Sequence, residues 1–235
     1  ISIIDENYEE AQPGDEYWDE EQDRWFYFQT SGKKVKADDD EELKTKTING
    51  QKYGFIEDGR MVTDWFKASP TDALASAGDA EYSSSFMYFS NPEDGARYTK
   101  GWFKVVPGYY LERDEYENGS EYWYYADGDG NLYANTIETI KGKKYAFNEN
   151  GRMIDGLVFL EMVGSKEIAD VIDTDLYDTE EAFDEYVAEE ARVGGDEPSI
   201  RCYYFGDADD GAMKTGKQTV EIDGENFTFK FEDSG

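Results

Sequence analysis

The chain alternates short apolar, largely aromatic runs with turns that are rich in glycine and acidic residues. Each aromatic run is followed within a few residues by Gly and by Asp or Glu. Runs of this length that end in turn-forming residues predict β-strands closed by tight turns. The runs lie at residues 25–28, 87–89, 123–125 and 202–205.

A second recurring unit predicts tight β-hairpins. It begins Ile-x-Gly, and Asn-Gly or Asp-Gly opens two of its copies, as a two-residue hairpin turn would. Tyr145 and Phe147 stand two residues apart and share one face of a strand, with Ala146 on the other face, and residues 53–55 repeat this arrangement. We therefore expect the aromatic face to be buried or stacked. The copies lie at residues 48–55, 140–147 and 222–229.

A glycine motif links these units, with copies at residues 59–65, 95–102, 151–157 and 211–217. Its glycines follow acidic or amide residues in the copies at Gly59, Gly151 and Gly211, where they are expected to supply the positive φ that ends each hairpin. Two-stranded hairpins of this length are marginal alone, so they must stack on one another. The sequence therefore predicts an all-β protein, an elongated solenoid of stacked β-hairpin repeats with one short helical insertion.

Stretches without the repeat pattern divide the chain. The acidic beginning is expected to be irregular or partly helical. A loop rich in Ala, Ser and Asp is expected to hold at most one or two helical turns, around residues 72–78. The predicted segments are an acidic lead-in at 1–22, hairpin repeats at 23–160 with a loop insertion at 67–85, an insertion at 161–199, and C-terminal hairpin repeats at 200–235.

The insertion at 161–199 holds the best helix candidate, at about residues 179–193. Thr179 is a suitable N-cap, and Gly-Gly ends the segment. Apolar side chains on one side of the helix indicate that it packs against the hairpins. These side chains are Ala182, Phe183, Tyr186 and Val187.

Composition and charge narrow the class of partner. Aromatic residues make up 16% of the chain, and the formal net charge is -32 at pH 7. Such a charge repels nucleic-acid phosphates and anionic lipid, so we expect no nucleic-acid partner and no membrane insertion. No stretch approaches the roughly 20 apolar residues of a membrane span. The first residues lack the features of a signal peptide, as expected for a mature or trimmed fragment.

A single cysteine and the absence of histidine limit the chemistry. One cysteine excludes an intrachain disulfide framework, and without histidine the chain lacks Ser-His or Cys-His catalysis and the commonest zinc ligand. Cys202 lies in an aromatic run, which favours a buried structural thiol over a reactive one. A glycosidase needs two carboxylates across a cleft, and a thin solenoid offers few such clefts. We therefore predict no enzymatic activity and no cofactor.

One acidic turn is a weak match to a calcium loop. Asp127, Asp129 and Asn131 alternate along it, and Glu138 follows, so their oxygens are candidate calcium ligands. Leu132 stands where an EF-hand needs Gly, and no helix pattern flanks the segment. An acidic hairpin turn is therefore the favoured prediction, and no metal site is expected.

Taken together, the aromatic runs, the Gly-x-Met-x-Thr-Gly-Trp pattern and the Ile-x-Gly-Lys-Lys-Tyr-x-Phe unit resemble the cell-wall-binding repeat superfamily of Gram-positive bacteria. This superfamily includes choline-binding modules, glucan-binding domains and clostridial toxin repeats. The resemblance covers roughly residues 23–66, 86–160 and 200–235. It implies a hairpin solenoid displayed outside the cell, with ligand sites where aromatic side chains of consecutive hairpins converge.

The resemblance also implies which residues bind. In the choline-binding branch, the walls of a site are the Trp of the aromatic run, the Trp of Gly-Trp and a nearby Tyr. The matching positions here are Trp25, Trp123, Trp65, Trp102, Tyr27, Tyr125 and Tyr204.

Several repeats depart from this pattern. Leu157 and Lys217 replace the Trp of Gly-Trp, and Met87 and Cys202 replace the Trp of the aromatic run. Lys217 also puts a cation where a cationic choline would sit. The surviving site is therefore expected at Trp102, Trp123 and Tyr125.

The predicted function is a non-catalytic cell-wall or surface-glycan binding module that uses aromatic sites at repeat junctions. Aromatic faces stack on sugar rings and hold quaternary ammonium groups by cation–π attraction. The expected partners are a cell-wall polysaccharide, a glucan or a choline-decorated teichoic acid. The expected location is secreted, at the cell surface or associated with the cell wall.

The alternative is a structural or adhesive spacer whose ligand sites are lost, or a protein-interaction module that uses the acidic stretch at 180–190. The end of the chain, residues 231–235, has no polar cap. Such an end indicates either pairing, as a homodimer through the terminal repeats, or truncation.

Overall fold

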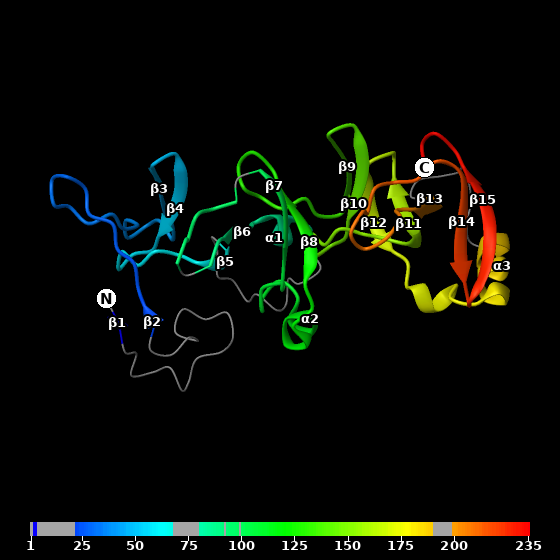
Figure 1. Ribbon diagram of the computed structural model, residues 1–235, viewed down its shortest axis with the longest axis horizontal. Helices are drawn as coiled ribbons and strands as arrows, with labels where there is room; N and C mark the ends of the chain where they lie inside the picture. The colour runs from blue at the N-terminus through cyan, green and yellow to red at the C-terminus, as the bar shows by residue number, and fades with distance from the viewer. Residues whose placement is uncertain (1, 4–21, 68–79, 92, 99, 190–198) are drawn as a thin grey trace. The chain divides into compact units, whose positions relative to one another are not determined.

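The computed structural model describes residues 2–3, 22–67, 80–91, 93–98, 100–189 and 199–235. The chain divides into two compact units, Ile1–Leu132 and Tyr133–Gly235, which are described separately (Figure 1). Every sheet in the described residues is antiparallel, and most of the strands form hairpins. The predicted repeat block at 23–160 runs across the division, because similar repeats build the end of the first unit and the start of the second.

Tight hairpins form where Asn-Gly and related pairs predict them. Their turns have two successive residues with positive φ, as at Asn49 (51°) and Gly50 (86°), and at Asp223 (50°) and Gly224 (77°). Positive φ at both central residues is typical of a type I′ turn, whose twist matches that of the flanking strands. The predicted hairpins are thus confirmed. They are β3 (Lys44–Ile48) with β4 (Gln51–Phe55), β9 (Thr136–Ile140) with β10 (Lys143–Phe147), and β14 (Gly216–Ile222) with β15 (Glu225–Phe231).

Wider hairpins join the glycine motifs to the aromatic runs. In each, the first strand begins at the Trp position of a glycine motif or one residue before it, and the second strand contains an aromatic run. Longer connections between the two strands carry the short helices α1 (Ala80–Ser84), α2 (Arg113–Asn118) and α3 (Glu180–Glu189). The pairs are β5 (Asp64–Lys67) with β6 (Phe86–Phe89), β7 (Gly101–Val105) with β8 (Tyr122–Ala126), and β11 (Leu157–Val163) with β13 (Ser199–Tyr204).

In the second unit a five-stranded sheet, in the order β10-β9-β12-β11-β13, joins neighbouring hairpins. Strand β12 (Glu167–Val171) pairs with β11 and meets β9 where Glu167 faces Thr136. The segment at 161–199 therefore begins inside a strand and supplies a further one, which differs from the expected insertion. The reason lies in β11, where Phe159, Leu160 and Met162 are fully buried, because apolar residues cover both faces of the strand.

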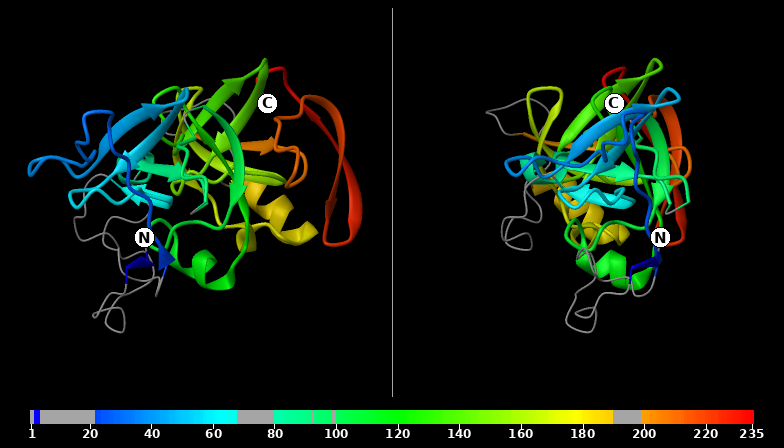
Figure 2. Two further views of the ribbon diagram at one scale, coloured as in Figure 1. Left: turned by 60° about the vertical axis from the view of Figure 1, so that its left-hand side comes forward. Right: turned by 90° about the vertical axis from the view of Figure 1, so that its left-hand side faces the viewer.

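The helix predicted in this segment is present as α3. Thr179 caps it, because its Oγ1 accepts a hydrogen bond from the Ala182 backbone N–H at 3.2 Å. The Phe183 ring lies 5.7 Å from that of Phe159 and 5.5 Å from that of Phe229, between centroids. The helix thus lies beside the hairpin β14–β15, as Figure 2 also shows. In the described part of the chain, no helix is long and apolar enough to cross a membrane.

Other expectations differ from the structure or lie outside the described residues. At the two ends of the acidic lead-in, β1 (Ser2–Ile3) pairs with β2 (Gln22–Asp23). Helix α2 has no buried residue, so no apolar periodicity predicts it. The helical turns expected around 72–78 and the end of the expected helix, residues 190–193, lie outside the described residues.

The first aromatic run, residues 25–28, does not form the predicted strand. It lies outside the regular strands. The Tyr27 carbonyl accepts a hydrogen bond from the Val35 backbone N–H at 2.9 Å, and the Trp25 carbonyl accepts one from Met61 at 2.8 Å. Because these bonds go to two different segments, no continuous ladder forms.

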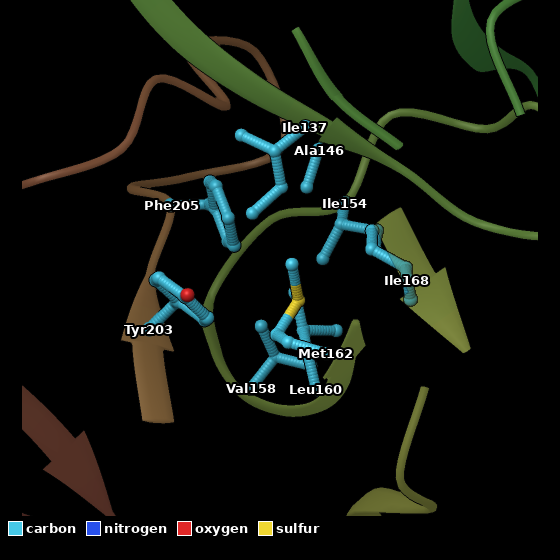
Figure 3. Close-up of a cluster of buried hydrophobic side chains, with 9 residues drawn as sticks. All are labelled: Ile137, Ala146, Ile154, Val158, Leu160, Met162, Ile168, Tyr203 and Phe205. Carbon is cyan, nitrogen blue, oxygen red and sulfur yellow. The ribbon is translucent and has the colours of Figure 1, made fainter. Parts of the chain in front are cut away.

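Each unit has its own apolar core. In the first unit aromatic rings dominate, and those of Phe103 and Tyr124, from the two strands of β7–β8, stack with centroids 5.7 Å apart. In the second unit side chains from β9 to β13 converge, and Figure 3 shows them gathered around one another. The buried members of this cluster are Ile137, Ala146, Ile154, Val158, Leu160, Met162, Ile168, Tyr203 and Phe205.

A repeated turn follows the second strand of most hairpins. The chain reverses over a few residues and returns by one isolated bridge, as from Phe55 to Met61. The turn glycines Gly59, Gly151 and Gly211 have φ values of 89°, 78° and 56°, which confirms the predicted positive φ. Residues with a side chain rarely adopt this conformation.

The bridging side chain of one repeat lies over the turn glycine of the next. Met61 covers Gly95, and Met153 covers Gly211, so closely that a Cβ at either glycine would overlap the methionine side chain. At these two turns a glycine without a side chain therefore allows one repeat to pack closely on the next. The other pairs of this kind are Lys34 with Gly59 and Arg97 with Gly130.

Gly54 in β4 tests how tightly the repeats pack. A Cβ at Gly54 would stand 2.9 Å from ring atoms of the fully buried Phe89 and 2.6 Å from Leu43. In the corresponding hairpin of the second unit this position is Ala146, which packs in a core with Phe205. We expect Gly54→Ala to lower the free energy of unfolding by ~1–3 kcal/mol, measured by urea denaturation, because the added methyl group overfills the contact.

Gly128→Ala is the matched control. Gly128 is exposed, and a Cβ there meets nothing within 4 Å. Its free energy of unfolding should change by no more than ~0.5 kcal/mol. Equal stability of the two variants would mean that Gly54 is not a packing constraint.

Candidate functional site

An open pocket of about 190 Å³ lies in the first unit, where consecutive repeats meet. Five of its nine lining residues are aromatic, and two are acidic. It includes Trp25 and Tyr27, which the family resemblance marks as ligand-binding residues. Its lining consists of Trp25, Phe26, Tyr27, Ile48, Tyr53, Phe55, Met61, Glu93 and Asp94.

The first aromatic run and the hairpin β3–β4 form the aromatic walls. The hydrogen bond from the Met61 backbone N–H to the Trp25 carbonyl holds the run against the segment that follows β4. The rings of Tyr27 and Phe55 lie 6.4 Å apart between centroids. Phe55 is fully buried, so it anchors the run through this ring contact.

Met61 and the turn after β6 complete the pocket. The Met61 side chain lies over Gly95, in the turn that carries Glu93 and Asp94. Asn91 shapes this turn, because its Oδ1 accepts hydrogen bonds at 3.1 Å from the backbone N–H groups of both acidic residues. The packing of one repeat on the next thus brings the acidic turn to the aromatic run.

The pocket is open to solvent at Trp25. This side chain is 56% exposed, whereas Tyr53 is half-buried and its hydroxyl donates a hydrogen bond to Gln51 Oε1 at 3.0 Å. Glu93 and Asp94 are exposed, and neither forms an ion pair with a residue that the structure describes. An exposed ring beside such carboxylates attracts cations.

One cation of the protein already stands near the pocket. Lys34 Nζ lies 5.3 Å from the centroid of the Phe26 ring, and it donates a hydrogen bond to the Asp58 carbonyl. Phe26 therefore carries a cation of the protein itself. Of the other rings of the lining, Phe55 is buried, and those of Trp25, Tyr27 and Tyr53 remain at least partly accessible to a ligand.

Strands β7 and β8 bring together Trp102, Trp123 and Tyr125. The Trp102 ring meets that of its cross-strand partner Tyr125 at 5.1 Å and that of Trp123 at 6.3 Å, edge to face in both cases. Because side chains alternate along a strand, these rings lie on the face opposite Phe103 and Tyr124, which fill the core. Tyr125 is only 7% exposed, so the ring surface left for a ligand belongs to the two Trp side chains.

Lys104 lies on the same face of the hairpin and gives that face a positive charge. Its Nζ lies 5.8 Å from the centroid of the Trp123 ring, and the two residues are cross-strand partners. A cation beside the ring disfavours a second cation by repulsion. This face therefore suits a neutral or anionic group better than a quaternary ammonium group.

Trp65 belongs to the core of the first unit. Its ring packs edge to face against those of Tyr88 and Tyr124, with centroids 5.2 and 5.1 Å apart. Its indole N–H donates a hydrogen bond to the Val106 carbonyl at 2.8 Å. Burial in this cluster raises the pKa of Tyr88 to about 12. The aromatic face of Trp65 is thus used for packing.

Tyr204 belongs to the second unit, whereas the other residues that the resemblance marks belong to the first. Its ring stacks on that of Phe231 with centroids 6.1 Å apart. Its cross-strand partner is Leu157, at the Trp position of a glycine motif. The wall that faces Tyr204 across the hairpin is therefore aliphatic.

Part of the pocket is not marked by sequence reasoning, namely Tyr53, Met61, Glu93 and Asp94. Tyr53 and Met61 belong to recurring units, so their places at a repeat junction are a signal in the sequence. The acidic pair lies in a turn that is two residues longer between strand and bridge than the turn ending at Met61. The acidic turn between Phe205 and Met213 has the same length, so length alone does not single out the turn of the pocket.

The Asp127 carboxylate accepts hydrogen bonds from the backbone of its own turn. Asp127 Oδ1 accepts hydrogen bonds from the backbone N–H groups of Asp129 at 2.8 Å and Asn131 at 2.9 Å. Asn148 and Asp207 shape the equivalent turns in the same way. Across the described ranges, no three His, Cys, Asp or Glu side chains are grouped so that they could hold a metal ion. The hydrogen bonds of the Asp127 carboxylate within its own turn favour the acidic-turn interpretation.

Cys202 is a free thiol in β13, packed against the cluster around Phe159. Burial raises its pKa to about 12. The thiol is therefore protonated at neutral pH and poorly nucleophilic. This is the behaviour of a structural cysteine.

Substitution of two tryptophans is expected to distinguish a residue of the core from a residue of the binding site. Trp65→Ala should lower the free energy of unfolding by about 3 kcal/mol, because it removes a ring from the core. Trp25→Ala should change it by no more than ~0.5 kcal/mol, because that side chain is mostly exposed. Urea denaturation followed by circular dichroism measures both values. A large loss for Trp25→Ala would assign its ring to the core instead.

No protein-family model matches the sequence, and no curated protein matches it. Solved structures do match. The modular autolysin LytC from Streptococcus pneumoniae, in complex with a synthetic peptidoglycan ligand, is 15% identical with a TM-score of 0.41. That match covers 99% of this chain and 34% of the LytC chain, so this chain spans less than two thirds of LytC.

Choline binding protein F from Streptococcus pneumoniae, in the presence of a peptidoglycan analogue, is 17% identical with a TM-score of 0.38, and the match covers 100% of this chain and 77% of that chain. The choline binding domain of a further Streptococcus pneumoniae protein is 24% identical with a TM-score of 0.29, covering 47% of this chain and 92% of that domain. Of these three solved structures, the last two are named for choline binding, and the first is an autolysin in complex with a peptidoglycan ligand.

Proposed function

We propose that this chain is a non-catalytic binding module for a cell-wall or surface polymer, with its principal site in the pocket around Trp25. The observation that carries the proposal is the pocket itself, in which the exposed Trp25 ring stands with Tyr27 and Tyr53 around an open volume of about 190 Å³. Its position at a repeat junction agrees with the sites that the family resemblance implies.

Aromatic rings supply two kinds of binding in such a pocket. Their faces stack on the apolar faces of sugar rings, and each ring attracts a cation by ~0.5–2 kcal/mol. One open pocket of this kind binds weakly, but a polymer that presents the same group many times gains by effective concentration. The candidate polymers are a cell-wall polysaccharide, a glucan or a choline-decorated teichoic acid. A protein that binds them resides at the cell surface or in the cell wall.

The cluster of Trp102, Trp123 and Tyr125 is the second candidate site. Lys104 stands against the Trp123 ring, so we propose sugar stacking there rather than cation binding. The two sites would then recognise different groups of one polymer.

The alternative function, a spacer or protein-interaction module, is supported by a surface of the second unit. This surface comprises η3 (Thr174–Leu176) and α3, where Leu176 is 55% and Val187 41% exposed. Exposed carboxylates surround them, and an acidic surface with apolar side chains suits a basic protein partner. The carboxylates are Asp173, Asp175, Asp178, Glu180, Glu181, Asp184 and Glu185.

Sedimentation with purified Gram-positive cell walls tests the proposed function. We expect the wild-type chain to sediment with the walls and Trp25→Ala to weaken binding about fivefold, the effect of losing a ring contact of about 1 kcal/mol. Phe28→Ala is the matched control, because Phe28 is also 56% exposed but does not line the pocket. It should bind like the wild type.

The double variant Trp102→Ala, Trp123→Ala tests the second site in the same assay. Full binding by both this variant and Trp25→Ala would show that the sites are wrongly assigned. If the wild-type chain binds no cell-wall polysaccharide, peptidoglycan, glucan or choline resin, the spacer is the better interpretation.

A further inference from the structure

We infer that the pocket around Trp25 selects a protonated amine that carries N–H groups over a quaternary ammonium group. The inference rests on the proposed function of this pocket as the ligand site. Aromatic rings alone do not make this choice, because they attract both kinds of cation. The choice comes from the acidic turn that lines the pocket with them.

The rings and the carboxylates come from different repeats and meet at the pocket. Trp25 belongs to the first aromatic run, whereas Glu93 and Asp94 belong to the turn after β6. Met61 connects the two, because its backbone N–H binds the Trp25 carbonyl and its side chain lies over Gly95. The lining of the pocket therefore combines aromatic residues with two acidic residues.

The two carboxylates are available to a ligand. Their turn is held through backbone N–H groups that donate to Asn91 Oδ1, so the side chains of Glu93 and Asp94 are not needed to form it. Both side chains are exposed, and neither is ion-paired with any other described residue. The ammonium group of Lys34, which stands near the pocket, is engaged by the Asp58 carbonyl.

An ammonium group with N–H donors uses both kinds of wall. It donates charge-assisted hydrogen bonds to the carboxylate oxygens while its charge faces the rings. A quaternary ammonium group has no N–H and keeps its charge behind methyl groups, so it gains only the attraction of the rings and a screened charge interaction. The ligand class is therefore a primary ammonium group, carried by an amino sugar or by an aminoacyl substituent of a polymer.

Ethanolamine and choline are the matched probes, because they differ only in three N-methyl groups. Titration of the full chain at low salt, followed by tryptophan fluorescence, should give a Kd for ethanolamine about fivefold below that for choline, the upper range for an exposed ion pair. The double variant Glu93→Gln, Asp94→Asn should bring the two Kd values together, mainly by weakening ethanolamine. Trp25→Ala should weaken both probes.

The double variant Glu57→Gln, Glu149→Gln is the matched control. These residues lie in equivalent turns outside the pocket lining, and the variant removes the same formal charge. It should keep the wild-type ratio of Kd values. Glucosamine is expected to bind more tightly than N-acetylglucosamine, whose nitrogen is uncharged. Tighter binding of glucosamine than of ethanolamine would identify an amino sugar as the source of the amine, and the reverse an aminoacyl group.

Equal Kd values, tighter binding of choline, or no binding of either probe by the wild-type chain would overturn the inference. An unchanged ratio in the Glu93→Gln, Asp94→Asn variant would do the same. These results are distinct from failure of the proposed function. Cell-wall binding that depends on Trp25 without an amine preference leaves that function standing, whereas an amine preference without wall binding removes the function and leaves the amine site.

Discussion

The contact between a bridging side chain and the turn glycine of the next repeat is the constraint on which the rest of the structure depends. Met61 over Gly95 and Met153 over Gly211 leave no space for a Cβ, and these glycines have φ values of 62° and 56°. Glycine is thus required for two reasons, its backbone conformation and the space it leaves. Each such contact fixes one turn relative to the preceding strand. In the first unit it fixes the acidic turn of the pocket beside the aromatic run.

The aromatic side chains divide between core and surface according to the strand face they occupy. On β7–β8, Phe103 faces the core, and Trp102 lies on the opposite face. The same residue type packs inside at Trp65 and is mostly exposed at Trp25. Aromatic content alone does not separate these roles, because burial depends on which neighbouring repeat covers each face.

Much of the fold follows from turn chemistry that acts within a few residues. Asn49 and Gly50 specify a hairpin through their positive φ, and Thr179 specifies where a helix begins. The spacing of aromatic residues along the strands also predicts which rings meet on one hairpin. The cluster of Trp102, Trp123 and Tyr125 on β7–β8 is an example. The joining of β12 to β9 and the approach of the acidic turn to the pocket are different, because they depend on packing between segments distant in the sequence. No local sequence pattern indicates such packing, so these features can be identified only from the structure.

The wide hairpins and the turns tolerate change to different degrees. Strands β5 and β6 pair residue by residue from Asp64 with Phe89 to Lys67 with Phe86, so both ends of their connection are held in place whatever its length. Turn glycine and bridging residue, in contrast, stand two positions apart, as at Gly59 and Met61, and this spacing recurs at Gly95 and Arg97 and at Gly151 and Met153. In the evolution of this architecture, new segments are therefore expected to enter at the wide connections, while the number of repeats changes only by whole units.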